Sequence, residues 1–298
     1  FYQKMVLSIF FKWEIIQLMG IVLKSLMAVH AINFKFIFVV IIMVIASDVV
    51  ASEKPTDEAN LSVGILCQKD NIINTIPEVY DPINSKYGID VSEFQGKIHW
   101  DTVFDQCVDF IFVRASEGIT IQDKFYGENM TVLTEKNFFS GPYHFFVIGD
   151  DPEKQISNFV SQIKNYRPPN LAPVVDIEET SFVYTPKPDK KEIQDALLKA
   201  LKLVEEKTGC SPIVYTNLTF ANKYLDNQLL SKYKLWLADY NKTPVTPNAW
   251  MDRGYSIHQY KTFNDFPGIN SDSGKLDLNR SIIRDSSFEE EFKCEYSF

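Results

Sequence analysis

Short apolar segments alternate with amphipathic ones along the chain after residue 85. Eight segments rich in β-branched and aromatic residues predict strands at 87–92, 109–116, 140–147, 172–178, 211–217, 234–240, 255–261 and 275–279. Apolar residues recur with helical spacing between several of them, most clearly over 152–166 and 189–208. In the second of these helices, Glu192 near the start and Lys207 with Gly209 at the end suit the helix dipole and a C-cap.

Strands that alternate with helices predict parallel pairing through right-handed crossovers, and eight of them favour closure into a barrel. The gaps 241–254 and 262–274 are rich in Pro, Gly, Asn and Asp and predict loops instead of helices. The predicted fold class is therefore α/β, a single modified TIM-like (β/α) barrel with eight strands and fewer than eight helices.

The first 51 residues have the pattern of a signal or targeting segment. Met27 is a candidate start, which would make 1–26 non-native, and Lys35 precedes an apolar run over 36–46 that ends before Val49 and Ala51. The run is shorter than the ~20 residues that span a bilayer. A membrane anchor extended by the apolar residues of 15–34 is the alternative, but Lys24 and His30 interrupt it. We expect a secreted protein without stable membrane insertion, in which 52–84 form a polar lead-in.

Composition narrows the class of protein. The 298 residues include 30 Lys and Arg against 39 Asp and Glu, and 45% are hydrophobic. This excludes a disordered chain, and the acidic balance without a basic stripe argues against a nucleic-acid partner. The part beyond residue 51 has the length typical of one β/α barrel, ~250 residues.

Four cysteines, Cys67, Cys107, Cys210 and Cys294, are widely spaced. No two of them form a CxxC pair, so neither a zinc site nor any other metal or cofactor is predicted. In an exported chain they could form up to two disulfides in any of three pairings, and buried thiols are the alternative.

Four acids interrupt apolar stretches at predicted strand ends, where β/α barrels carry their chemistry: Asp90, Asp176, Glu178 and Asp277. Because side chains alternate along a strand, Asp176 and Glu178 should face the barrel axis while Val175 and Ile177 face the helices. Two adjacent carboxylates repel each other, so one should have a raised pKa, as a general acid needs. Asp90 and Asp277, on the first and last strands, should become neighbours when the barrel closes. The alternative is that these acids cap loops or pair with groups such as Arg114.

The spacing of the central pair limits the mechanism. Residues i and i+2 lie ~6.7 Å apart on one side of a strand, whereas an enzymic nucleophile and its acid flank the scissile bond of a sugar ~5–5.5 Å apart. We therefore expect Asp176 to orient a substrate N-acetyl group that attacks, and Glu178 to protonate the leaving oxygen. Aromatic residues near the same strand ends support a sugar ligand, Tyr143 and Trp236 above all; the others are Phe94, Phe145, Tyr215, Tyr240 and Tyr260. His144 and His258 are interpreted as buried, hydrogen-bonded residues.

Six motifs carry a family resemblance: Asp90-Val-Ser-Glu-Phe-Gln-Gly-Lys-Ile-His-Trp100, Phe110-Ile-Phe-Val-Arg-Ala-Ser-Glu-Gly118, Gly141-Pro-Tyr-His-Phe145, Pro173-Val-Val-Asp-Ile-Glu178, Leu235-Trp-Leu-Ala238, and His258-Gln-Tyr260 followed by Asp277-Leu-Asn279. In this order, over 85–285, they resemble the family 25 glycoside hydrolases, which are lysozyme-type N-acetylmuramidases. The lead-in 52–84 and a C-terminal tail, 286–298, have no counterpart in the resemblance.

The resemblance implies a barrel with fewer than eight helices and a retaining cut between N-acetylmuramic acid and N-acetylglucosamine in peptidoglycan. It places the catalytic acid on Glu178, its partner on Asp176, and supporting acids on Asp90 and Asp277. The candidate substrate-binding residues are Tyr143, Trp236, Tyr215, Phe94 and Gln259.

The expected function is thus a muramidase whose partner is the peptidoglycan polysaccharide. Two rivals stay open: a non-catalytic barrel that binds peptidoglycan or chitin, and a hydrolase of another N-acetylated polysaccharide. The sequence does not indicate an oligomeric state.

Overall fold

The computed structural model describes residues 85–241, 243–269 and 275–298. All described residues belong to one compact unit. The predicted signal segment, the lead-in 52–84 and Cys67 lie outside the described residues.

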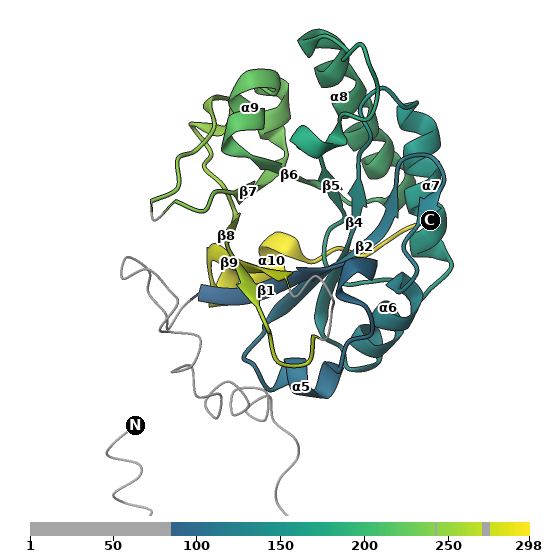
Figure 1. The fold of residues 1–298 in the computed structure, drawn as a ribbon, viewed down its shortest axis with the longest axis vertical. Coiled ribbons are helices and arrows are strands. Elements are labelled where there is room, and N and C mark those ends of the chain that lie inside the picture. The colour runs from purple at the N-terminus through teal and green to yellow at the C-terminus, as the bar shows by residue number, and fades with distance from the viewer. Residues whose placement is uncertain (1–84, 242, 270–274) are drawn as a thin grey trace, which may run out of the picture. The chain divides into compact units, whose positions relative to one another are not determined.

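Eight strands close into a barrel, which confirms the predicted fold class (Figure 1). They are β1 (Ser85–Val91), β2 (Phe110–Glu117), β4 (Phe139–Phe145), β5 (Val174–Asp176), β6 (Ile213–Asn217), β7 (Lys234–Ala238), β8 (Ile257–Asn264) and β9 (Lys275–Arg284). Pairing of β1 with both β2 and β9 closes the sheet, and the two-residue β3 (Ile121–Gln122) adds an antiparallel extension to β2.

The prediction that all strands are parallel is wrong for the last one. Neighbours from β1 through β2 and β4 to β8 pair in parallel, but β9 runs antiparallel to both β8 and β1. Only residues 265–274 connect β8 to β9. A parallel crossover needs a dozen or more residues, so this short connection returns the chain as an antiparallel neighbour.

Six α-helices occur in the described part of the chain, fewer than the eight of a complete β/α barrel: α5 (Trp100–Phe104), α6 (Tyr126–Glu135), α7 (Pro152–Lys164), α8 (Lys190–Thr208), α9 (Leu218–Tyr224) and α10 (Asp285–Phe292). The two helices with the clearest periodicity are confirmed. Asp151 caps α7 before Pro152, and Asp189 forms a capping box with Glu192 at the start of α8. No helix in the described ranges is long and apolar enough to cross a membrane.

Alternation along the strands separates two hydrophobic layers. In β2, Ile111 and Val113 pack outward with the helices, whereas Phe110 and Phe112 belong to a cluster inside the barrel. Glycines make room for these inner rings, because a Cβ at Gly88 would lie 2.3 Å from the Phe110 ring and one at Gly141 would lie 2.5 Å from Phe112. In the described part of the chain, the inside of the barrel around these rings is therefore packed with side chains.

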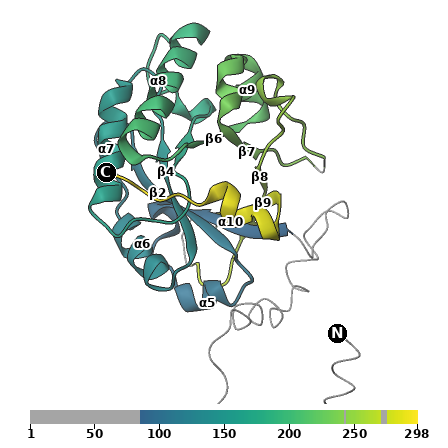
Figure 2. The same cartoon turned by 180° about the vertical axis from the view of Figure 1, so that it is seen from behind.

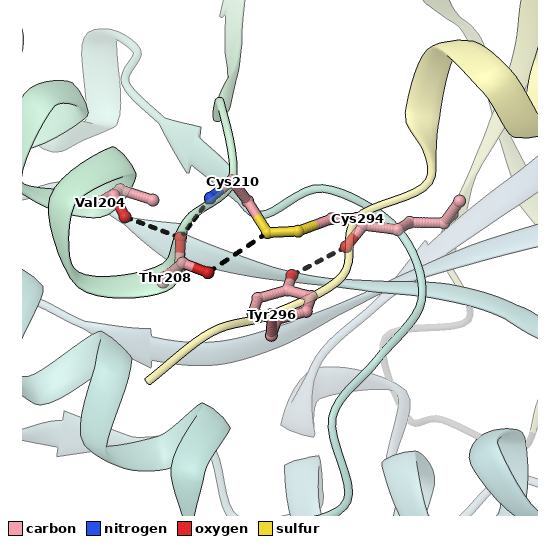
Figure 3. Close-up of a disulfide and its surroundings, with 6 residues drawn as sticks. Val204, Thr208, Cys210, Cys294 and Tyr296 are labelled. Carbon is pink, nitrogen blue, oxygen red and sulfur yellow. Dashed lines mark hydrogen bonds between the residues drawn. A yellow bond between two sulfur atoms is a disulfide. The ribbon is translucent and has the colours of Figure 1, made fainter.

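The segment after β9 completes this inner cluster. Helix α10 lies across one end of the barrel (Figure 2), and its fully buried Phe288 and Phe292 pack with Phe110 and Phe112. A disulfide between Cys210 and Cys294 fastens the chain beyond α10 to the loop after α8 (Figure 3). The Tyr296 hydroxyl adds a hydrogen bond of 2.7 Å to the carbonyl oxygen of Leu171.

Removing this disulfide should destabilise the barrel. The bridge spans 84 residues, and the entropy lost from the unfolded chain by closing such a loop corresponds to roughly 2–5 kcal/mol. The double variant Cys210→Ser/Cys294→Ser should therefore unfold at clearly lower denaturant than the wild type under non-reducing conditions, as measured by circular dichroism. An unchanged midpoint would show that α10 holds its position without the bridge.

Candidate active site

A cavity of about 420 Å³ lies at the mouth of the barrel. Its lining includes all nine residues that the sequence indicates as site candidates: Asp90, Asp176, Glu178, Asp277, Tyr143, Trp236, Tyr215, Phe94 and Gln259. Residues from strands far apart in the sequence therefore converge on one site.

Asp176 and Glu178 lie on the same side of β5 and its continuation, as predicted. Val175 and Ile177 between them are fully buried in the outer layer that faces the helices. Glu178 is half-buried at the start of a short 3₁₀ turn, η2 (Glu179–Ser181), where its carboxylate accepts a hydrogen bond from the Thr180 hydroxyl. The turn thus holds Glu178 at the cavity wall beside Asp176.

Asp90 and Asp277 face each other as register partners on β1 and β9. Asp277 lies near the beginning of β9, not at the carboxyl end of a strand as predicted from the sequence. It reaches the same rim because β9 runs in the opposite direction to its neighbours. The Thr262 hydroxyl donates to Asp277 Oδ1 over 2.6 Å.

Crowding and burial raise the pKa of three of these carboxyls. Burial, then Asp277, raise the pKa of Asp90 to about 8, although hydrogen bonds from Asn279 and Gln259 oppose the rise. Burial also raises the pKa of Asp277. The pKa of Asp176 is raised well above its ordinary value by burial first and then by Glu178 and Asp90. These carboxyls therefore hold protons that carboxyls in water would release.

In the described part of the chain, one carboxyl oxygen of Asp176 is buried without a hydrogen-bond partner. The side chain is 8% exposed, and among the described residues no group forms a hydrogen bond to its Oδ1. The cation nearby, Arg114, is committed to three other carboxylates: its guanidinium lies 2.9 Å from Glu93, 3.2 Å from Glu117 and 2.9 Å from Asp123. A buried acceptor without a partner is costly, so this oxygen is suited to a donor on a bound molecule.

The aromatic candidates occupy different depths. Phe94 is 65% exposed at the rim and lies 4.8 Å from the Arg114 guanidinium. Tyr143 and Tyr215 are half-buried in the wall, and burial raises the pKa of both hydroxyls well above the ordinary value. Trp236 is only 2% exposed, and its ring packs against Phe112 and Tyr215 on the cavity floor.

Part of the first motif proves to be structural. Ser92 caps the turn η1 (Glu93–Gln95) that follows β1, and Gln95 Oε1 accepts from the Ser92 backbone N–H over 2.7 Å. Gln95 Nε2 also donates to the Lys275 carbonyl oxygen at 2.9 Å. These contacts tie the turn to β9 and so fix both strands that carry the Asp90–Asp277 pair.

Sequence reasoning did not assign a role to several residues at the site. Glu117 lines the cavity at the end of β2, where the strand-end criterion used for the other acids would have found it. Asn279 donates to Asp90, but its position depends on the antiparallel register of β9, which the sequence pattern did not reveal. Tyr240, predicted as an aromatic sugar contact, instead donates its hydroxyl to Gln259.

The two histidines are buried and hydrogen-bonded, as predicted. His144 contacts Ser116 Oγ at 2.8 Å, and the Nε2 of His258 contacts the Asp239 carbonyl oxygen at 2.6 Å. Burial lowers the pKa of each to about 4. Neither lines the cavity.

Comparisons with known proteins agree with this geometry. The model of the glycosyl hydrolases family 25 matches residues 89–269. The chain is 28% identical over 200 residues to the uncharacterized protein YegX of Escherichia coli K12, covering 65% of this chain and 68% of that protein. It is 24% identical over 204 residues to lysozyme M1 of Streptomyces globisporus, covering 66% and 69% of the two chains.

A solved family 25 glycosyl hydrolase from Bacillus anthracis has the same fold, with a TM-score of 0.59 at 24% identity over 71% of this chain and 95% of that one. The barrel with acids at its mouth defines a glycoside hydrolase. The family match covers more than half of the chain, and the chain belongs to glycosyl hydrolase family 25.

The buried acids at the mouth of the barrel should lower the free energy of unfolding by an amount that depends on pH. Below about pH 4, Asp90 is protonated in both the folded and the unfolded chain. Between pH 4 and about 8 only the unfolded chain ionises it, so its contribution destabilises the fold progressively as the pH rises. Asp90→Asn should therefore stabilise the protein at pH 7 by at least about 1 kcal/mol, or about 2–4 °C in Tm, and by much less at pH 4.

Differential scanning calorimetry at both pH values tests this expectation. Asp252→Asn, at an exposed position outside the cavity, is the matched control and should change Tm little at either pH. A Tm for Asp90→Asn that is equal to or below wild type at pH 7 would contradict the assignment of burial and repulsion at Asp90.

Proposed function

We propose that this glycoside hydrolase is an exported lysozyme-type N-acetylmuramidase. It cleaves the β-1,4 bond between N-acetylmuramic acid and N-acetylglucosamine in peptidoglycan, with retention of configuration. The observation that carries the proposal is the buried Asp176 with its unpartnered Oδ1, beside Glu178 and opposite the Asp90–Asp277 pair.

In the first step Glu178 donates its proton to the oxygen that bridges the two sugars. The acetamido carbonyl oxygen of the N-acetylmuramic acid attacks the anomeric carbon, and the bond to the leaving sugar breaks. Asp176 Oδ1 accepts the acetamido N–H and orients this group. The product of the step is a positively charged oxazolinium ring on the substrate.

In the second step the Glu178 carboxylate takes a proton from water, which attacks the anomeric carbon and reopens the ring. Two inversions at this carbon give net retention. The same-side placement of Asp176 and Glu178 supports this route over attack by an enzymic carboxylate.

Charge explains why the arrangement favours the reaction. Burial and neighbouring carboxyls hold the pKa of Asp176 high. The positive charge that develops on the acetamido group stabilises the ionised Asp176 carboxylate, so its pKa falls and its proton passes to solvent, and the cation offsets the repulsion between the carboxylates. The interaction is stronger in the transition state than in the ground state, as catalysis requires.

Export and the peptidoglycan partner complete the proposal. Export is supported by the apolar run 36–46 with its flanking Lys35, and the partner by the similarity to lysozyme M1. Aromatic residues at the rim and in the wall of the cavity, such as Phe94 and Tyr143, suit the faces of sugar rings.

Glu178→Gln is the direct test of the proton donor. The amide has nearly the same shape but no proton to donate, so turbidity loss of a peptidoglycan suspension should slow by at least about 10²–10⁴-fold while the Tm and wall binding stay near wild type. Glu179→Gln, the exposed neighbour outside the cavity, is the matched control and should keep wild-type activity.

Lysis by Glu178→Gln at the wild-type rate would defeat the assignment. Wall binding by the wild type without release of reducing ends would favour the non-catalytic rival. Cleavage of chitin oligosaccharides but not of peptidoglycan would favour the rival substrate.

A further inference from the structure

Asp90 lies at the end of a continuous hydrogen-bond network in the barrel wall. Its Oδ2 accepts from Gln259 Nε2 over 3.0 Å and from Asn279 Nδ2 over 2.7 Å. Gln259 and Asn279 are register partners on β8 and β9, and their side chains are 2% and 0% exposed. One carboxyl oxygen of Asp90 is thus held by two buried amides.

The orientation of the Asn279 amide is set from behind. Trp236 Nε1 lies 2.8 Å from Asn279 Oδ1. An indole N–H can only donate, so the amide oxygen must face Trp236 and the amide NH₂ must face Asp90. The Gln259 amide has matching support, because the hydroxyls of Tyr215 and Tyr240 each donate to its Oε1 over 2.9 Å.

We propose that Trp236 is a positioning residue that acts through Asn279: it forces Asp90 Oδ2 to accept hydrogen bonds and so confines the carboxyl proton to Oδ1. An oxygen that accepts two N–H hydrogen bonds cannot also carry a proton that points toward either donor. Oδ1 then carries the proton and presents it to a sugar oxygen in the cavity.

This role agrees with the depth of Trp236. At 2% exposure the indole offers little face for stacking on a sugar ring, whereas its N–H is fully used inside the wall. The inference rests on the proposed muramidase chemistry only for the use of the proton, because the network itself follows from contacts within the chain.

The electrostatic surroundings of Asp90 determine the sign of the expected effect. The titratable groups that interact with it from the other strands and loops are Asp277, Asp176, Glu178, Tyr143, Tyr215 and Tyr240. Against these groups and burial, the Asn279 and Gln259 hydrogen bonds lower the pKa of Asp90. Loosening the Asn279 amide should therefore raise this pKa further.

Trp236→Phe tests this positioning role, because phenylalanine keeps an aromatic ring on the cavity floor and removes the N–H donor together with part of the ring volume. We expect the apparent pKa of Asp90 to rise by about one unit, the equivalent of one hydrogen bond. The measurement is a ¹³C-carboxyl NMR titration of the full chain labelled at Asp, with Asp90→Asn to assign the resonance. Trp250→Phe is the matched control, since Trp250 is also buried and donates its N–H to the Tyr233 carbonyl oxygen at 2.9 Å, away from the cavity.

Tyr240→Phe is a second variant that preserves the buried core, because Tyr240 is 59% exposed. It removes one of the two donors to Gln259 and should raise the pKa of Asp90 by a smaller amount, because the Tyr240 hydroxyl also lowers the pKa of Asp277 and its loss weakens the repulsion at Asp90. Its control is Tyr184→Phe, another exposed tyrosine, whose hydroxyl donates to Asp150. An unshifted Asp90 in both Trp236→Phe and Tyr240→Phe, or equal shifts in the controls, would overturn the proposal.

Activity separates this inference from the proposed function. With an active wild type, the alkaline limb of kcat/KM on peptidoglycan should move to higher pH in Trp236→Phe along with the NMR titration. An unmoved limb would overturn the use of the Asp90 proton in catalysis. A shifted Asp90 titration in a protein that does not cleave peptidoglycan would instead refute the proposed function and leave the positioning role of Trp236 intact.

Discussion

Mutual repulsion among buried carboxyls is the constraint on which the site depends. Asp90, Asp176 and Asp277 all have a raised pKa because the barrel wall removes them from water and places acids beside them. Such a cluster opposes folding, and it is tolerated because the closed sheet below it is densely packed. Acids with a raised pKa stay protonated at neutral pH. A positive charge on the substrate favours the ionised form that the reaction needs.

Two features of the fold set the geometry of that cluster: the antiparallel strand β9 and the packing of α10 against the inner rings. The short connection before β9 makes this strand antiparallel, which brings Asp277 directly opposite Asp90. Packing of Phe288 and Phe292 against the inner rings closes the other end of the barrel, so a ligand has access to the acids from the mouth. The disulfide at Cys294 secures the second feature.

The sequence predicted much of this because its signals are local. Alternation placed Asp176 and Glu178 inward, since Val175 and Ile177 between them are apolar. Glu192 near the start and Gly209 at the end marked α8. It failed where the answer depends on partners far along the chain. The direction of β9, the burial of Trp236 and the network from Trp236 through Asn279 to Asp90 all follow from strand register, which no local pattern specifies.

Proton release on binding a cation tests the central claim most directly. The ligand would be a permanently charged bicyclic analogue of the N-acetylmuramic acid oxazolinium ion, titrated into the full chain by calorimetry in buffers of different ionisation enthalpy. If the developing positive charge lowers the pKa of Asp176, binding at neutral pH should release close to one proton, and Asp176→Asn should release far less. Tight binding without proton release would contradict the account.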